Sequence, residues 1–140
     1  MRSVLATIAL WTGLVPAARA GDLTITVERL RSAFGAMLVA VHDDPARFPS
    51  DWNGAVALAR IAAIPGSVRV VLPGLAPGRY AVIAVHDEDD NGEMSKGAFG
   101  FPREGFGTSN NPVFVGPPRF GPALITVTGD ASISIRMAYF

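Results

Sequence analysis

The sequence predicts an all-β protein, an antiparallel β-sandwich of six or seven short strands with one long ordered loop. Short segments rich in valine, isoleucine and alanine recur along the 140 residues. Several alternate apolar and polar residues, which is typical of a strand with one face in water. Turns rich in glycine and proline separate these segments, and no segment predicts a convincing helix. This combination of short strands and frequent turn signals is typical of a β-sandwich.

The first twenty residues are expected to lie outside the fold, as a signal peptide. Arg2 supplies a positive charge, residues 4–15 form an apolar run, and Ala18-Arg19-Ala20 is a small-x-small cleavage site. The apolar run is too short to span a bilayer comfortably. We therefore expect cleavage after Ala20, export to the periplasm or the medium, no membrane span in the mature chain, and one domain over residues 21–140.

Composition narrows the class of protein further. The chain has 12 basic and 12 acidic side chains, and it lacks the basic patch expected of a nucleic-acid binder. It has no cysteine, so an exported form cannot use disulfides. Its stability must come from packing, hydrogen bonds and a bound ion if there is one.

The strands follow from local patterns. Residues 23–28 alternate apolar and polar residues, whereas residues 36–42 and 80–86 are apolar on both faces and are expected in the middle of a sheet. Gly129-Asp130 predicts a tight hairpin turn. The expected strands cover residues 23–28, 36–42, 67–72, 80–86, 124–128 and 132–140, and residues 55–64 fit either a seventh strand or a mixed crossover.

Aromatic residues within one connection and just after another should pack onto the core. Residues 43–54 contain two prolines and form a loop, from which we expect Phe48 and Trp52 to fold back. Residues 73–78 (PGLAPG) form a compact turn. Tyr80 follows this turn, and we expect it to bury its ring and to return its hydroxyl to the backbone.

An acidic loop directly after the strand at residues 80–86 is the main candidate site. Residues 87–92 (DEDDNG) satisfy the first half of the calcium-loop pattern D-x-[DN]-x-[DN]-G. Alternate side-chain oxygens converge on one centre, and the glycine permits the turn that brings the next carbonyl inward. The predicted calcium ligands are Asp87, Asp89, Asn91, the Glu93 carbonyl and Ser95.

This calcium loop is incomplete, because its twelfth position is Ala98 rather than a bidentate glutamate. The missing ligand must then come from elsewhere, with Glu104, Glu88 or Asp43 available. The alternative interpretation is a solvated acidic loop that binds nothing. Against it, this many carboxylates repel one another unless a positive charge neutralises them.

The two histidines give a second metal hypothesis. His42 and His86 each end an apolar strand and precede an aspartate. If the strand ends meet, His42, His86 and Asp87 suit zinc or copper, either in a binding protein or in a metal-dependent enzyme. The alternative is that each histidine hydrogen-bonds to a neighbouring loop, since two histidines underfill a tetrahedral site.

Residues 97–120 are long for a loop but contain five phenylalanines, so we expect an ordered flap over the sandwich. Hydrogen bonds from polar side chains would order it; alternatively, exposed Phe101 and Phe106 would form the rim of a ligand site. The candidates for binding an unknown ligand or protein partner at this flap are His86, Arg103, Glu104, Ser109 and Asn110, and Asn111 is a further residue expected to order it.

Catalysis has little support in the sequence. There is no cysteine nucleophile, and residues 107–111 lack the Gly-x-Ser-x-Gly elbow. The carboxylates crowd one loop instead of facing each other across a cleft, as a glycosidase requires. We therefore predict an exported, non-catalytic module that binds calcium.

Three stretches, LPGLAPGRYAVIAVHDEDDNGE, FGFPREGFGTSNN and GPPRFGPA, resemble the exported bacterial proteins grouped as domain of unknown function 2141. The resemblance covers most of the mature chain. It implies an immunoglobulin-like or transthyretin-like sandwich whose biochemical role is not established. The chain departs from the family pattern at Ser95, where aspartate is usual, and at Arg103, where lysine is usual. The first departure weakens any metal site carried over from the family.

Overall fold

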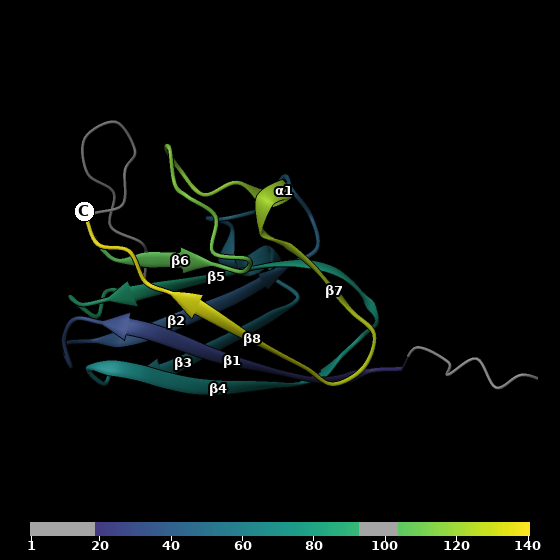
Figure 1. Cartoon of the computed structure of the whole chain (residues 1–140), viewed down its shortest axis with the longest axis horizontal. Coiled ribbons are helices and arrows are strands. Elements are labelled where there is room, and N and C mark those ends of the chain that lie inside the picture. Colours follow the sequence, from purple (N-terminus) through teal and green to yellow (C-terminus); the bar gives the residue numbers. More distant parts are fainter. Residues whose placement is uncertain (1–18, 93–103) are drawn as a thin grey trace, which may run out of the picture.

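The computed structural model describes residues 19–92 and 104–140, and within them the chain is nearly all β (Figure 1). Residues 1–18 of the expected signal peptide lie outside the described part. No helix of the described residues is long and apolar enough to cross a membrane. The elements are β1 (Gly21–Leu30), β2 (Ala36–His42), η1 (Trp52–Gly54), β3 (Ala57–Ala62), β4 (Gly66–Leu75), β5 (Gly78–Asp87), β6 (Phe106–Thr108), α1 (Phe120–Ala123), β7 (Leu124–Val127) and β8 (Ala131–Arg136).

The strands form two sheets packed face to face, as Figure 1 shows. One sheet has the order β4-β1-β8, and the other has the order β3-β2-β5-β6 with β7 also paired to β5. Apolar side chains from both sheets share one buried cluster, which includes Ile25, Val39 and Val82. The predicted β-sandwich is thereby confirmed, while the finer immunoglobulin-like or transthyretin-like assignment stays a prediction.

The central strands are buried on both faces, as their continuous apolar sequence predicts. Every residue of β2 is buried, and in β5 every residue from Tyr80 onward is buried. One face of these strands meets the three-stranded sheet. The other face carries a second apolar cluster, in which Phe48 of the 43–54 loop and Phe106 of β6 cover Leu38 and Ile83.

Two aromatic residues lie where the sequence predicts. Tyr80 is buried, and its hydroxyl donates to the Ala76 carbonyl at 2.6 Å, so it anchors the turn that precedes it. Trp52 is half-buried and packs against the second apolar cluster beside Phe48. The 43–54 loop is therefore part of the packed structure.

The prediction that the last two strands form a hairpin is wrong. β7 pairs with β5 and β8 pairs with β1, so the turn around Gly129 (φ 141°) carries the chain from one sheet to the other. The β1–β8 pairing is also parallel, a departure from the otherwise antiparallel pattern. The described chain has eight strands rather than six or seven, because residues 57–62 form β3 and the flap contributes β6.

Candidate functional site

The acidic loop begins on a buried carboxylate. Asp87 is the last residue of β5 and is fully buried, so the loop starts from within the packed part of the protein. Its Oδ1 accepts from the Asn91 backbone N–H at 3.1 Å, and its Oδ2 accepts from the Gly92 N–H at 2.7 Å. Positive φ angles at Asp90 (58°) and Gly92 (78°) allow this turn. Asp87 therefore shapes the loop that follows it.

Glu104 reaches the same place from the flap. β5 pairs antiparallel with β6, with Val85 opposite Phe106, and the His86 N–H donates to the Gly105 carbonyl at 2.8 Å. Continuing this register by two residues places Glu104 opposite Asp87. Only glycine fits at position 105, because a Cβ there would lie 2.2 Å from the Tyr139 ring. Glu104, like Asp87, is buried.

Three carboxylates come together at this point. Asp87, Asp89 and Glu104 each offer an oxygen, and these oxygens all lie within 4.8 Å of one another. Asn91 donates from its side-chain amide to Asp89 at 3.3 Å, so it supports the group. Of the predicted ligands, Asp87 and Asp89 are thus brought together, and Glu104, one of three residues that the sequence offered for the missing ligand, lies with them. Glu93 and Ser95 lie outside the described residues.

Arg60 of β3 brings a positive charge to this group. Its Nη1 lies 3.8 Å from Oδ2 of Asp87, and its Nη2 pairs with Asp90. Half of the Arg60 side chain is exposed, so solvent weakens its effect on the buried carboxylate. The Arg60 guanidinium thus lies beside Asp87 of the carboxylate group and pairs with the neighbouring Asp90.

The other acidic candidates are placed elsewhere. Glu88 accepts from Arg31 Nε at 2.9 Å and from the Ser32 hydroxyl at 3.0 Å, and the bond from Arg31 holds the pKa of Glu88 below its usual value. Asp43 follows His42, which pairs with Ala81 at the far end of β5 from Asp87. Neither belongs to the carboxylate group.

The two histidines are not brought together. In the β2–β5 register His42 is opposite Ala81, whereas His86 is opposite Met37, a separation of five residues or roughly 16 Å along the strands. They also point to opposite faces of the sheet, since His86 contacts Tyr139 and His42 contacts Phe48. No shared site for His42, His86 and Asp87 exists in this geometry.

The two histidines differ in their hydrogen bonding. His86 Nδ1 lies 2.8 Å from the Tyr139 hydroxyl, and its Nε2 lies 2.8 Å from the Phe34 carbonyl, so both ring nitrogens are engaged. His42 is fully buried with no hydrogen-bond partner among the described residues for either ring nitrogen. Burial lowers the pKa of His42, and Asp51, Asp43 and Asp44 oppose this effect.

The Ser-Asn-Asn segment of the flap, residues 109–111, anchors the flap to the two sheets through hydrogen bonds. Ser109 accepts from the Val82 N–H at 3.0 Å and donates to the Ala123 carbonyl. Asn110 donates to the Leu124 carbonyl at 2.7 Å, and Asn111 joins the backbone of β8 through Ser134 and Arg136. Phe106 is buried rather than exposed on a rim. Phe101 and Arg103 lie outside the described residues.

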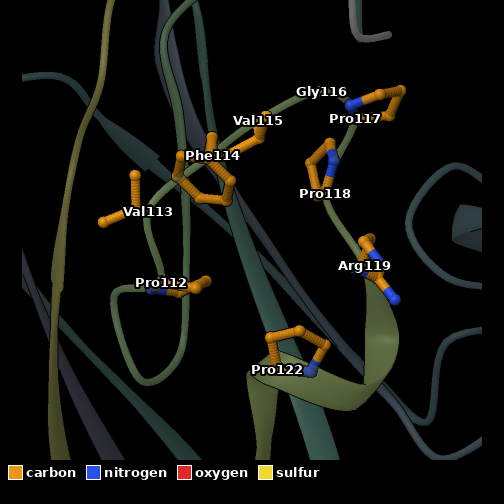
Figure 2. A pocket seen from close by; sticks show the side chains of 9 residues that line it. All are labelled: Pro112, Val113, Phe114, Val115, Gly116, Pro117, Pro118, Arg119 and Pro122. Carbon is orange, nitrogen blue, oxygen red and sulfur yellow. The ribbon is translucent and has the colours of Figure 1, made fainter.

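After the Ser-Asn-Asn segment the flap forms an apolar hollow of about 350 Å³. Figure 2 shows Phe114 and Pro118 on opposite sides of it, with Arg119 and Pro122 below them. Among the described residues that line it, Arg119 is the one charged residue, and prolines and valines make up most of the rest.

The chemistry of the carboxylate group suits a hard cation. All its donors are carboxylate oxygens, which calcium, magnesium and manganese prefer, whereas zinc and copper favour histidine. Two oxygens bound to one calcium ion at 2.3–2.6 Å are separated by at most about 5 Å, and the three oxygens here meet that limit.

Comparison with known proteins gives one match. None of the curated proteins and none of the solved structures matches this chain. Residues 25–135, well over half of the sequence, match the family domain of unknown function 2141, which is described as an uncharacterized protein conserved in bacteria. The match spans the fold from β1 to β8, including the carboxylate group and the Ser-Asn-Asn segment. The chain belongs to this bacterial family.

Proposed function

We propose that this protein is an exported, non-catalytic β-sandwich module that binds calcium through Asp87, Asp89 and Glu104. The observation that carries the proposal is the meeting of three carboxylates: oxygens of the buried Asp87 and Glu104 and of the exposed Asp89 all lie within 4.8 Å of one another. Like charges directly opposite in a sheet are destabilising, and burial increases their repulsion. A divalent cation bound between these oxygens would offset that repulsion.

Calcium suits this loop better than magnesium does. The proposed ligands come from a turn and from a separate segment, and calcium tolerates such irregular oxygen cages. Magnesium demands a smaller, regular octahedron and gives up its water reluctantly. Ordinary extracellular calcium modules bind at about 10⁻⁴–10⁻³ M, and we expect an affinity in that range.

Export and partner binding complete the proposed function. β1 begins at Gly21, so the residue expected to follow signal cleavage is also the first residue of the sandwich. N-terminal sequencing of material collected outside the cytoplasm should therefore begin at Gly21, and retention of Met1 or Arg2 would contradict export with cleavage.

The flap, where we expect an unknown ligand or protein partner, exposes Val113 and Val115 beside its apolar hollow.

The decisive experiment for calcium is thermal unfolding after chelation, with and without added calcium. A ligand that binds only the folded state stabilises it by about 2.7 kcal/mol at a hundredfold excess over its Kd. Asp89→Asn and Glu104→Gln should each abolish most of this gain. Asp90→Asn is the matched control, because Asp90 is exposed beside Asp89 but does not belong to the carboxylate group.

Two outcomes would overturn the calcium proposal. The first is a melting curve that millimolar calcium leaves unchanged, which would make the loop a solvated turn. The second is an effect of Asp90→Asn as large as that of Asp89→Asn, which would mean that calcium only screens surface charge. A shift with zinc but not with calcium would instead favour histidine ligands.

A further inference from the structure

Strand β3 lies at the edge of the five-stranded sheet with one neighbour, β2, among the described residues. Its core-facing residues Ala57, Ala59 and Ile61 are only half-buried, in contrast to the fully buried β2. In an antiparallel pair, alternate residues direct their backbone N–H and C=O groups away from the partner strand. Within residues 19–92 and 104–140, the outward-directed backbone groups of β3 therefore have no partner strand, and such an edge is a template for another strand.

The side chains of this edge are also apolar where they meet solvent. Val56, Leu58 and Ile64 expose 45%, 54% and 57% of their surfaces. The charge in the middle of the strand, on Arg60, is directed to Asp87 and Asp90. A hollow of about 430 Å³ between Trp52, Leu58 and Arg60 continues the apolar strip.

In contrast to β3, the edge strands of the three-stranded sheet, β4 and β8, are protected against pairing with another strand. Natural proteins protect edge strands with charges, prolines, bulges and polar side chains. β4 carries Arg69, Pro73 and two register shifts against β1, and β8 directs Ser132 and Ser134 outward. β3 has none of these devices apart from an arginine whose charge is already paired.

We propose that β3 pairs antiparallel with β3 of a second copy of this chain and joins two five-stranded sheets across a two-fold axis. Such an interface is isologous, so each copy offers the same edge and association stops at two. A register centred on Ile61 puts Leu58 opposite Ile64 of the second copy. It also puts Arg60 opposite Ala62, so that the two guanidinium groups do not face each other.

Light scattering during gel filtration of the purified chain tests this interface. The expected mass is twice that of one chain, falling towards one chain on dilution. Leu58→Lys should raise the dimer Kd at least about tenfold, because it brings an unpaired charge to the strand junction. Val71→Lys is the matched control: Val71 is 49% exposed on β4, and its replacement should leave the Kd unchanged. Both positions are exposed, so both variants should fold.

Cysteine cross-linking tests the register, since the chain has no cysteine of its own. The double variant Leu58→Cys/Ile64→Cys should form a covalent dimer on mild oxidation. Within one copy these positions are about 20 Å apart along the strand, beyond the roughly 7 Å limit for a disulfide. A chain that stays monomeric at millimolar concentration, or a dimer that Leu58→Lys does not weaken, would overturn the proposal. So would a monomer whose β3 amides are protected only when an extended apolar peptide is added, because that result assigns the edge to a different partner.

Discussion

The hydroxyl of Tyr139 lies 2.8 Å from Nδ1 of His86 and joins the end of the chain to the end of β5. The other ring nitrogen of His86, Nε2, lies 2.8 Å from the Phe34 carbonyl, which can only accept, so Nε2 donates there. In the neutral ring Nδ1 is then an acceptor, so the Tyr139 hydroxyl donates to Nδ1 and accepts from the Arg31 backbone N–H at 3.1 Å. This chain of bonds holds the β1–β2 turn, β5 and the C-terminal segment together at the residue that precedes Asp87.

Tyr139→Phe should therefore destabilise the fold by about 1–3 kcal/mol, because it leaves a buried acceptor on His86 unsatisfied. The phenyl ring keeps the stacking with the Arg31 guanidinium, which lies 4.4 Å from the ring centroid. Urea unfolding measures the loss. Adding His86→Leu to Tyr139→Phe should cost much less than the sum of the two single changes, since both polar partners are then gone. Simple additivity would argue against the bond.

Tyr80 gives a second stability prediction with an internal comparison. Tyr80→Phe removes only the 2.6 Å bond to the Ala76 carbonyl and should cost about 0.5–1.5 kcal/mol. Tyr80→Ala also empties a buried aromatic site and should cost about 3–5 kcal/mol. The two unfolding midpoints in urea should differ clearly. Equal losses would mean that the hydroxyl alone anchors the turn.

The comparison of His42 with His86 shows how far sequence reasoning reaches. Both residues end an apolar strand in the same Val-His-Asp sequence, so the pattern correctly predicts two central strands. It does not contain the register that places His42 opposite Ala81, or the pleat that turns the two rings to opposite faces. These depend on pairing between distant segments, and the proposed shared metal site depended on them.

The same limit explains the site residues that the sequence analysis missed. Arg60 lies in a segment whose alanines left strand and crossover open, so its approach to Asp87 was not foreseen. Tyr139 lies within the last predicted strand, residues 132–140, but β8 ends at Arg136, and the hydrogen bond of Tyr139 to His86 depends on the parallel β1–β8 pairing. Glu104 was among the candidate ligands, whereas its position opposite Asp87 follows from the unpredicted strand β6.

His42 should make stability depend on pH. Burial lowers its pKa below the 6.5 expected of the unfolded chain. The native state then binds fewer protons than the unfolded state, so the stabilisation is fully present above pH 6.5 and is lost as the pH falls through and below this value. The slope contributed by this residue is at most about 1.4 kcal/mol per pH unit. His42→Leu should reduce the slope between neutral and mildly acidic pH, measured by urea unfolding. An unchanged slope would show that other groups cause the acid sensitivity.

Arg60 should compete with calcium for Asp87. Its guanidinium lies 3.8 Å from the carboxylate that the proposed ion would share, so it would repel an ion bound there. A unit charge about 6 Å from a divalent ion costs about 1.4 kcal/mol even at the dielectric constant of water, and salt reduces this value. Arg60→Gln should therefore tighten calcium binding about three- to tenfold in calorimetric titration at low salt. Arg47→Gln is the matched control, because Arg47 is equally half-exposed but pairs with Asp44 and Asp51. If both variants change the affinity equally, calcium responds to net charge alone, and a weaker affinity in Arg60→Gln would place the ion away from Asp87.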